Sequence, residues 1–222
     1  FRQVYFNEKS LEEKLKYEKD NLVDGSGILQ YLTQGLELNV KDMATLMMII
    51  SDNVATNIMI DYLGIDNINK TIKNLGCLDT KLYCKFESCE DKAFSVTTTK
   101  DYSHIYELIN EGKLWDKYIS EEIIDILKNQ KYHEMVGDGI PKIYTETKND
   151  ILSYVISKSG KYQSVRNDGG IVSTKYGNYI LTIFIKDFLD KDYLNDEYID
   201  KYGRNISNML FNRYIALKGK FC

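Results

Sequence analysis

The most informative pattern of apolar and polar positions lies at residues 43–64, where two apolar runs flank a polar triplet. The first run, at residues 44–50, is apolar almost all round a helix, which predicts a buried helix. The second run repeats its apolar residues at helical spacing and ends at Gly64, a common helix stop. The sequence therefore predicts two core helices joined by a turn at Ser51, Asp52 and Asn53.

This triplet has two interpretations. Ser, Asp and Asn are all favourable N-caps, so the triplet can simply start the second helix. A functional role is the alternative, because polar side chains between buried helices need partners and an unpaired one costs roughly 1–3 kcal/mol. A second polar motif, described below, favours the functional interpretation.

Helical periodicity recurs elsewhere. It predicts helices at residues 66–75, 98–109, 120–130 and 194–218. Ser120 is the expected cap of the third of these helices, and a capping-box spacing at Ser10 and Glu13 predicts a short exposed helix or turn. In the last helix the residues expected to face inward are Ile199, Ile206, Leu210 and Leu217.

The pattern changes after residue 150. Residues 151–157, 165–173 and 179–185 are rich in β-branched and aromatic residues, with turns expected at 161–163 and 175–178. Three strands joined by short turns predict an antiparallel meander. We therefore expect an α/β (α+β) fold, with a helical lobe at about residues 7–149 and an α/β lobe at about 150–222.

Composition excludes several classes of function. The 222 residues carry 29 basic and 33 acidic side chains mixed along the chain, so no nucleic-acid partner is expected. No apolar run approaches the ~20 residues that span a bilayer. These 222 residues show no signal segment, but they open mid-pattern at Phe1, so this says little about the whole protein. With two histidines and no zinc-like cysteine spacing, neither a metal nor a cofactor is expected. The pairing of Cys77, Cys84 and Cys89 stays open.

Two segments read as loops. Residues 21–30 carry two glycines and no period, which predicts a loop that brings backbone close to another element. Residues 77–97 predict a long surface loop, and loops of that length are usually functional or disordered.

The second polar motif ends the first predicted strand, at Lys158-Ser159-Gly160. A lysine beside low-dielectric surface attracts an anion strongly, and Ser159 adds a hydroxyl donor. Gly160 lets a ligand lie against the strand edge, where the N–H of Lys161 can point at it. Alone this tripeptide is a weak signal, but after a buried Ser-Asp-Asn turn it is much more specific.

Taken together, these motifs make the chain resemble the penicillin-recognising serine hydrolases, in particular the class A β-lactamase-like branch. The resemblance covers essentially the whole chain. It includes the GSGIL, SDNxATN, KSG and RNDGGIV segments, which begin at Gly25, Ser51, Lys158 and Arg166.

The resemblance implies a role for each matching residue. Ser51 relays a proton to the leaving nitrogen, and Asn53 hydrogen-bonds the amide carbonyl of the ligand. Lys158 and Ser159 hold the substrate carboxylate, beside Gly160, and the backbone N–H of Lys161 supplies half of an oxyanion hole. Asp52 is expected to hold the turn, whereas Arg166 either adds to the carboxylate site or is an exposed strand arginine.

The chain departs from the family pattern in its nucleophile. The family places a Ser-x-x-Lys motif on the helix whose tail corresponds to residues 1–6, yet no serine here has a lysine three positions later. Either the N-terminal part of the fold, with the nucleophile, precedes Phe1, or the protein is a catalytically inactive homologue.

The second departure concerns deacylation. In the family, the loop corresponding to residues 77–97 carries a glutamate that activates water, with an asparagine a few residues on. Glu87 lies near the expected place, but the loop is shorter and lacks the asparagine. Glu87 and Glu90 can equally be solvated loop charges.

The leading hypothesis is an acyl-transfer serine hydrolase that acts on β-lactams or D-Ala-type cell-wall peptides, outside the cytoplasm. The alternatives are a non-catalytic binding or structural module and a slow penicillin-binding carboxypeptidase. An unpaired edge of the meander also predicts self-association.

Overall fold

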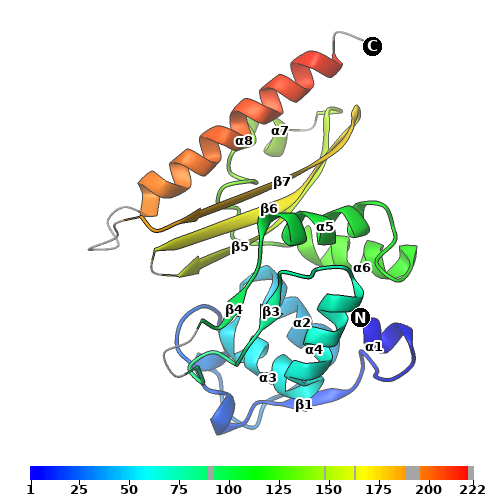
Figure 1. Cartoon of the computed structure of the whole chain (residues 1–222), viewed down its shortest axis with the longest axis vertical. Helices are drawn as coiled ribbons and strands as arrows, with labels where there is room; N and C mark the ends of the chain where they lie inside the picture. Colours follow the sequence, from blue (N-terminus) through cyan, green and yellow to red (C-terminus); the bar gives the residue numbers. More distant parts are fainter. Residues whose placement is uncertain (90–92, 148, 163, 189–195, 220–222) are drawn as a thin grey trace. The chain divides into compact units, whose positions relative to one another are not determined.

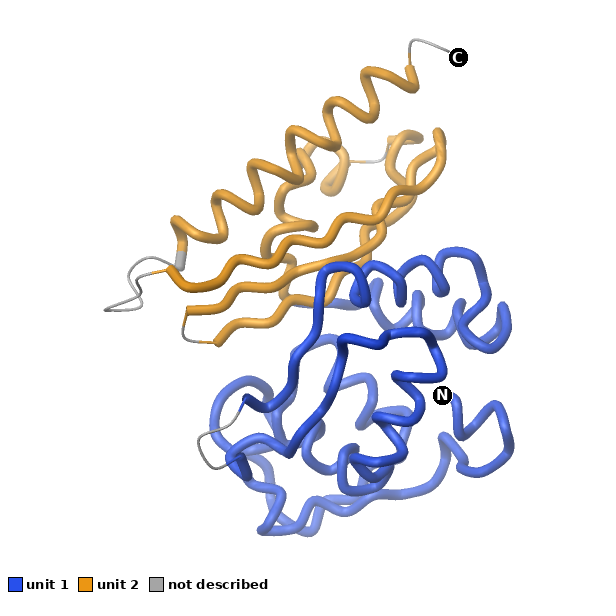
Figure 2. The backbone as a smooth tube through the Cα atoms, in the orientation of Figure 1, with its two compact units in different colours: residues 1–131 blue, residues 132–222 orange. Residues whose placement is uncertain are grey.

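The computed structural model describes residues 1–89, 93–147, 149–162, 164–188 and 196–219. The chain divides into two compact units, residues 1–131 (unit 1) and residues 132–222 (unit 2), as Figure 2 shows. Residues 132–149, which the sequence assigned to the helical lobe, thus belong with the sheet. Four residues used in the sequence predictions, Glu90, Gln163, Leu194 and Cys222, lie outside the described residues.

Unit 1 is built mainly from short helices (Figure 1). Its elements are α1 (Arg2–Tyr5), β1 (Lys14–Lys16), the 3-10 turns η1 (Lys19–Asn21) and η2 (Leu29–Tyr31), β2 (Glu37–Asn39), α2 (Val40–Ile49), α3 (Asn53–Leu63), α4 (Ile65–Asn74), β3 (Lys81–Leu82), β4 (Ser95–Val96), α5 (Thr99–Asn110) and α6 (Lys117–Leu127). β1 pairs with β2 and β3 pairs with β4, both antiparallel.

The two predicted core helices are confirmed as α2 and α3. The Asn39 side chain caps α2 by accepting from the N–H of Asp42, and Gly64, with φ of 79°, ends α3. Only the start of α2 is fully buried, at Val40, Met43 and Ala44, so the expectation of a helix buried along its whole length is partly wrong. The buried side of the pair forms the main core of unit 1.

Two other predictions for unit 1 need correction. Helix α6 begins at Lys117 rather than Ser120, because the Asp116 carboxylate accepts from the N–H of Ile119 at 2.7 Å and is the true cap. Ser120 is instead buried inside the helix and donates its hydroxyl to the carbonyl of Asp116. The predicted loop at 77–97 contains the β3–β4 pair. Residues 10–13 form a turn that leads into β1, one of the two conformations expected there.

Unit 2 consists of a meander with helices against it (Figure 1). Its elements are α7 (Lys142–Thr145), β5 (Leu152–Tyr162), β6 (Val165–Thr174), β7 (Gly177–Lys186) and α8 (Asp196–Lys218). The strand order β5-β6-β7 confirms the antiparallel meander. Strand β5 extends further than expected, so Lys161 lies within the strand and not in a turn.

Helix α8 buries a different face from the one predicted. Ile206, Leu210 and Leu217 are 45%, 45% and 42% exposed. The packed face instead carries small and polar residues together with one aromatic: Asp200, Gly203, Ser207 and Phe211. A Cβ on Gly203 would lie 2.2 Å from the Met135 sulfur, so glycine is what allows the helix to approach this closely.

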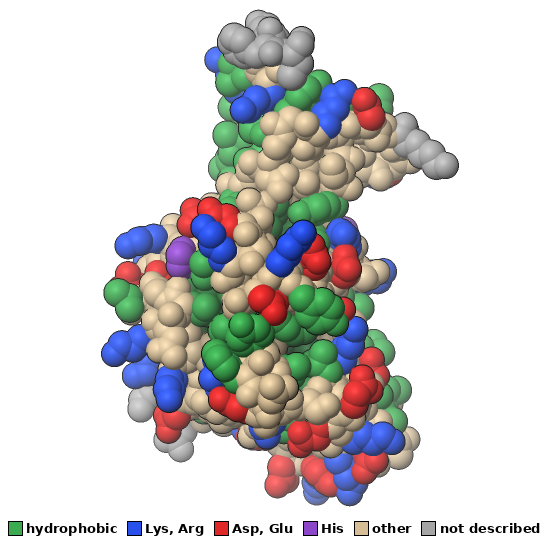
Figure 3. Space-filling view, turned by 90° about the vertical axis from the view of Figure 1, so that its right-hand side faces the viewer, with side chains coloured by type: hydrophobic (Ala, Val, Ile, Leu, Met, Phe, Trp, Pro, Cys, Tyr) green, Lys and Arg blue, Asp and Glu red, His purple; other side chains and the backbone are tan. Residues whose placement is uncertain are grey.

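On the face seen in Figure 3, basic and acidic side chains are interspersed without a stripe of one sign. Among the described residues, no helix has the length and apolar character needed to cross a membrane. The same residues contain no group of three or more His, Cys, Asp or Glu side chains placed to hold a metal ion.

Candidate functional site

The Ser-Asp-Asn turn lies between α2 and α3, as predicted. Ser51 adopts a left-handed backbone with φ of 54°, an uncommon conformation for a residue that has a side chain. Such backbone persists only where the surrounding structure fixes it, and it costs of order 1–3 kcal/mol. The residues on either side of Ser51 are held by the loop at residues 24–29, because the Ser26 hydroxyl donates to the carbonyl of Ile50 at 2.9 Å and Asp52 binds the loop backbone.

Asp52 is the structural centre of this turn. Its side chain is fully buried, and one carboxylate oxygen caps α3 by accepting from the N–H of Ala55 at 2.9 Å. The other oxygen accepts from the N–H groups of Ile28 and Leu29, at 2.7 and 3.0 Å. All these contacts are structural, in line with the expectation that Asp52 holds the turn.

The glycine-containing loop at residues 24–29 lies directly against the turn, which confirms that it brings backbone close to another element. The N–H of Asn53 donates to the carbonyl of Ser26 at 3.0 Å, and the Asn53 side-chain amide donates to the carbonyl of Asp24 at 2.9 Å. A Cβ on Gly27, whose φ is +103°, would lie 2.3 Å from the Asp52 carboxyl carbon. Only glycine fits at position 27. The Asn53 amide has two N–H groups, and the bond from one of them to the Asp24 carbonyl orients the side chain.

In unit 2, Lys158, Ser159, Gly160 and Lys161 follow one another on β5. Ser159 is nearly buried and pairs with Asp168 of β6, and Lys158 pairs with Gly169. Gly160 is exposed, and a Cβ built on it would meet nothing within 4 Å. Because β5 is the first strand of the sheet order, the KSG segment lies on an edge strand of the described sheet.

Burial lowers the pKa of the Lys158 ammonium, since removal from water disfavours its charged form. The charges of Asp168 and Glu134 oppose that shift. Asp168 is itself fully buried, and burial raises its pKa to about 6 although its carboxylate accepts from the N–H groups of Met135, Val136 and Gly169. These two acids therefore help to keep Lys158 cationic.

The Lys161 side chain belongs to a small ion network. Its ammonium lies 2.7 Å from the Asp200 carboxylate and 3.1 Å from that of Glu134. Burial alone would lower the pKa of Lys161, but its contacts with these two acids outweigh it and raise the pKa. The network fixes the Lys161 side chain. It does not involve the backbone N–H of Lys161, which is the group expected at the oxyanion hole.

Arg166 is not the exposed strand arginine that the sequence left open as one alternative. It is 2% exposed, donates to the carbonyls of Val165 and Tyr162, and stacks over the Phe188 ring at 5.1 Å. These contacts place its guanidinium at the turn between β5 and β6, where it binds backbone.

Glu87 lies in unit 1, on the loop between β3 and β4. Its side chain is exposed and its φ is 60°. The preceding residue, Phe86, is held by the buried Asn57 side chain, which accepts from the N–H of Phe86 at 3.0 Å and donates to its carbonyl. An exposed carboxylate of this kind agrees with the alternative of a solvated loop charge.

The described structure thus brings together Ser51, Asp52 and Asn53 with the 24–29 loop in unit 1. It brings together Lys158, Ser159, Gly160 and Lys161 with three acids in unit 2. Sequence reasoning missed those acids, Glu134, Asp168 and Asp200. The only sequence signal for them was the RNDGGIV segment, in which Asp168 follows a strand pattern as an unexpected charge.

Solved structures share this fold. The beta-lactamase from Sphaerobacter thermophilus is 26% identical, with a TM-score of 0.82 over 98% of this chain and 78% of that chain. A variant of PBP-A, solved as an acyl-enzyme complex with penicillin G, is 22% identical, with a TM-score of 0.79 over 96% and 76%. A reconstructed ancestral class A β-lactamase of Gram-negative bacteria is 17% identical, with a TM-score of 0.79 over 96% and 78%. No curated protein matches the sequence significantly.

The fold is therefore that of the class A β-lactamases, a helical part together with an antiparallel sheet flanked by helices. The model of the beta-lactamase enzyme family matches residues 1–214. The chain belongs to that family, and its membership supports a hydrolase-like function.

Proposed function

We propose that this protein carries out acyl transfer on β-lactams or D-Ala-type peptides, with a serine nucleophile that these 222 residues do not contain. The observation that supports this best is the Ser-Asp-Asn turn. Ser51 has a left-handed backbone, and the fully buried Asp52 that follows it binds the backbone of the loop at residues 24–29. A simple helix cap needs neither the strained backbone nor the additional loop contacts. A solved relative, the PBP-A variant captured as an acyl-enzyme with penicillin G, supports the substrate class.

In this proposal Ser51 relays a proton to the leaving nitrogen and Asn53 donates its second amide N–H to the ligand. Lys158 and Ser159 bind the substrate carboxylate, with Gly160 leaving room for it. The backbone N–H of Lys161 stabilises the oxyanion, a contribution worth about 3–4 kcal/mol of barrier in comparable sites. Arg166 is a candidate second contact for the substrate carboxylate, and its guanidinium also donates to the backbone carbonyls of Tyr162 and Val165.

The proposal places this activity outside the cytoplasm, as is typical of the family. The disulfide between Cys84 and Cys89 supports that assignment, because disulfides persist mainly in oxidising compartments.

A chromogenic cephalosporin tests the missing nucleophile. The 222-residue chain should give no turnover above buffer, because losing the nucleophile of a covalent mechanism removes most of the rate. Turnover that disappears in Ser51→Ala would show that the nucleophile lies in this chain and that the proposal has misplaced it.

The second candidate is a non-catalytic binding module, favoured by the absence of any Ser-x-x-Lys in the sequence. The residues upstream of Phe1 in the whole reading frame distinguish the two. A Ser-x-x-Lys motif there supports the enzyme, and a reading frame that starts without one supports the module.

A further inference from the structure

A disulfide closes a small ring in the loop between β3 and β4. It joins Cys84 to Cys89, whose Cα atoms lie 5.7 Å apart, within the usual range for a disulfide. Cys77 is buried and stays a free thiol. We call residues 84–89 the 84–89 ring, and Glu87 is a member of it.

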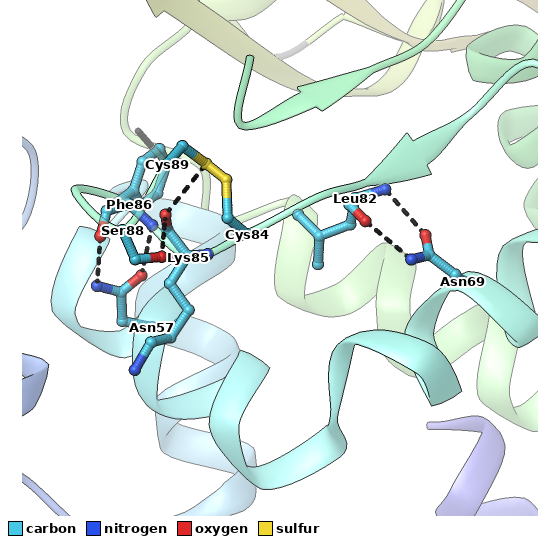
Figure 4. Close-up of a disulfide and its surroundings, with 8 residues drawn as sticks. All are labelled: Asn57, Asn69, Leu82, Cys84, Lys85, Phe86, Ser88 and Cys89. Carbon is cyan, nitrogen blue, oxygen red and sulfur yellow. Dashed lines mark hydrogen bonds between the residues drawn. A yellow bond between two sulfur atoms is a disulfide. The ribbon is translucent and has the colours of Figure 1, made fainter. Parts of the chain in front are cut away.

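The ring is attached to helix α3 at two points, of which Figure 4 draws the one at Asn57. The Asn57 side chain binds the Phe86 backbone twice: it accepts from the N–H at 3.0 Å and donates to the carbonyl oxygen at 3.4 Å. We call such a pair of hydrogen bonds a bracket. The Lys85 ammonium pairs with Asp61 at 2.7 Å. Asn57 follows Asn53 by four residues, so the anchor of the ring and the candidate ligand-binding amide share one face of α3.

A second bracket of the same kind lies outside the ring and serves as an internal reference. Asn69 of α4 accepts from the N–H of Leu82 at 2.9 Å and donates to its carbonyl at 2.8 Å (Figure 4). Leu82 is additionally held by its pairing with Ser95 in the β3–β4 pair. Phe86 has no strand partner among the described residues, and its ring stacks on Phe94 with the centroids 4.2 Å apart. Besides this stacking, its bracket depends on how the 84–89 ring itself is closed.

We propose that the Cys84–Cys89 disulfide is a positioning element, which holds the Phe86 backbone, and with it Glu87, against α3. Closing the ring limits the conformations that the 84–89 segment can explore, so the Asn57 bracket forms at a lower entropic cost. The link to acyl transfer rests on the proposed function, whereas the link between disulfide and bracket does not.

Reduction should therefore release the loop. A dithiol reductant supplies two electrons and two protons, the Cys84–Cys89 bond breaks to give two thiols, and the reductant becomes a disulfide. Access is available, because Cys84, Lys85 and Ser88 line a surface hollow of about 530 Å³ and both cysteines are only half-buried.

Amide hydrogen exchange in the 222-residue chain tests the positioning role. The variant Cys84→Ser/Cys89→Ser, and the wild type in dithiothreitol, should exchange the Phe86 amide roughly tenfold faster or more, because local opening becomes easier. The Leu82 amide should not change. Cys77→Ala is the control for loss of a cysteine outside the ring, and it should leave the Phe86 amide protected.

Equal exchange of Phe86 with and without the disulfide would overturn the proposal. So would parallel acceleration at Phe86 and Leu82, because that result means general destabilisation and not local positioning. Alkylation under denaturing conditions, read by mass, gives an independent check. Cys84 and Cys89 should be blocked without reductant and should react after it. Reaction of Cys84 and Cys89 before reduction would also overturn it.

The link between the disulfide and the reaction is tested on the protein encoded by the whole reading frame, after it has formed an adduct with penicillin. Breaking the disulfide should change the lifetime of the adduct several-fold while Cys77→Ala does not, and an unchanged lifetime would show that the ring does not serve the reaction. If no variant forms an adduct, the proposed function fails, and the exchange experiment still decides the positioning role.

Discussion

Replacing Asp52 by alanine should destabilise unit 1 far more than the loss of an ordinary helix cap. The change removes three hydrogen bonds, to the N–H groups of Ala55, Ile28 and Leu29. Leu29 and Ala55 are fully buried, so their N–H groups cannot turn to water once the carboxylate is gone. Ile28 is half exposed and can be hydrated.

The magnitude follows from those environments. Each buried N–H left without an acceptor costs about 1–3 kcal/mol, so the two together cost about 4 kcal/mol. Asn39→Ala is the matched control, because Asn39 caps the neighbouring helix α2 through a single bond to the exposed N–H of Asp42. Loss of that cap should cost about 1 kcal/mol.

Urea denaturation, followed by circular dichroism and by fluorescence of Trp115, the only tryptophan, measures both variants. In a parallel thermal melt, the melting temperature of a chain of this size should fall by roughly 12 °C for Asp52→Ala and roughly 3 °C for Asn39→Ala. Equal losses in the two variants would refute the claim that Asp52 organises the turn. A loss below about 2 kcal/mol for Asp52→Ala would refute it as well.

Three further predictions concern single features of the described residues. Gly27→Ala should cost about 3 kcal/mol or more, because its Cβ would overlap Asp52. Gly35→Ala, with a positive φ but only an ordinary 3.9 Å contact with the Lys16 side chain, should cost about 1 kcal/mol; equal urea midpoints would contradict this. Because burial lowers the pKa of Lys158, calorimetric titration with penicillin should show affinity falling as pH rises through a value below that of an ordinary lysine, and pH-independent binding would exclude Lys158 as the carboxylate ligand. The outer edges of β5 and β7, which pair with no further strand of the described sheet, and the exposed apolar residues of α8 predict self-association. Met209→Lys, at a position 71% exposed, should weaken it; a monodisperse wild-type monomer by light scattering would count against it.

Helical periodicity located α2 and α3 and the turn between them because both helices carry apolar stripes of ordinary spacing. The same logic chose the wrong face of α8. There the contact is made through Gly203 and Ser207, which are small enough for close approach, while larger apolar residues stay exposed. A prediction made from hydrophobicity alone misses packing that depends on the absence of a side chain.

The candidate site was predictable where short motifs carry it, at Ser51–Asn53 and at Lys158–Gly160. Its surroundings were not predictable, because Glu134, Asp168 and Asp200 come from separate elements and act only through their proximity in the folded chain. The β3–β4 pair was not predicted because strands of two residues are too short to show an alternating pattern.

The central proposal is that this protein transfers acyl groups and releases its product slowly. In that proposal, acylation requires the nucleophile, Ser51, Asn53 and the Lys158 strand. Deacylation requires a positioned general base, worth roughly 10²–10⁴-fold. Glu87 is the candidate for that base, but its side chain is exposed and its loop lacks the asparagine of the family pattern, so we expect this step to be slow.

Intact-mass spectrometry after brief exposure to penicillin tests this claim most directly, with the whole reading frame as the sample and the 222-residue chain as the control. We expect a long-lived penicillin adduct on the whole protein and none on the 222-residue control. Absence of an adduct on the whole protein, or fast turnover that collapses in Glu87→Gln, would contradict it.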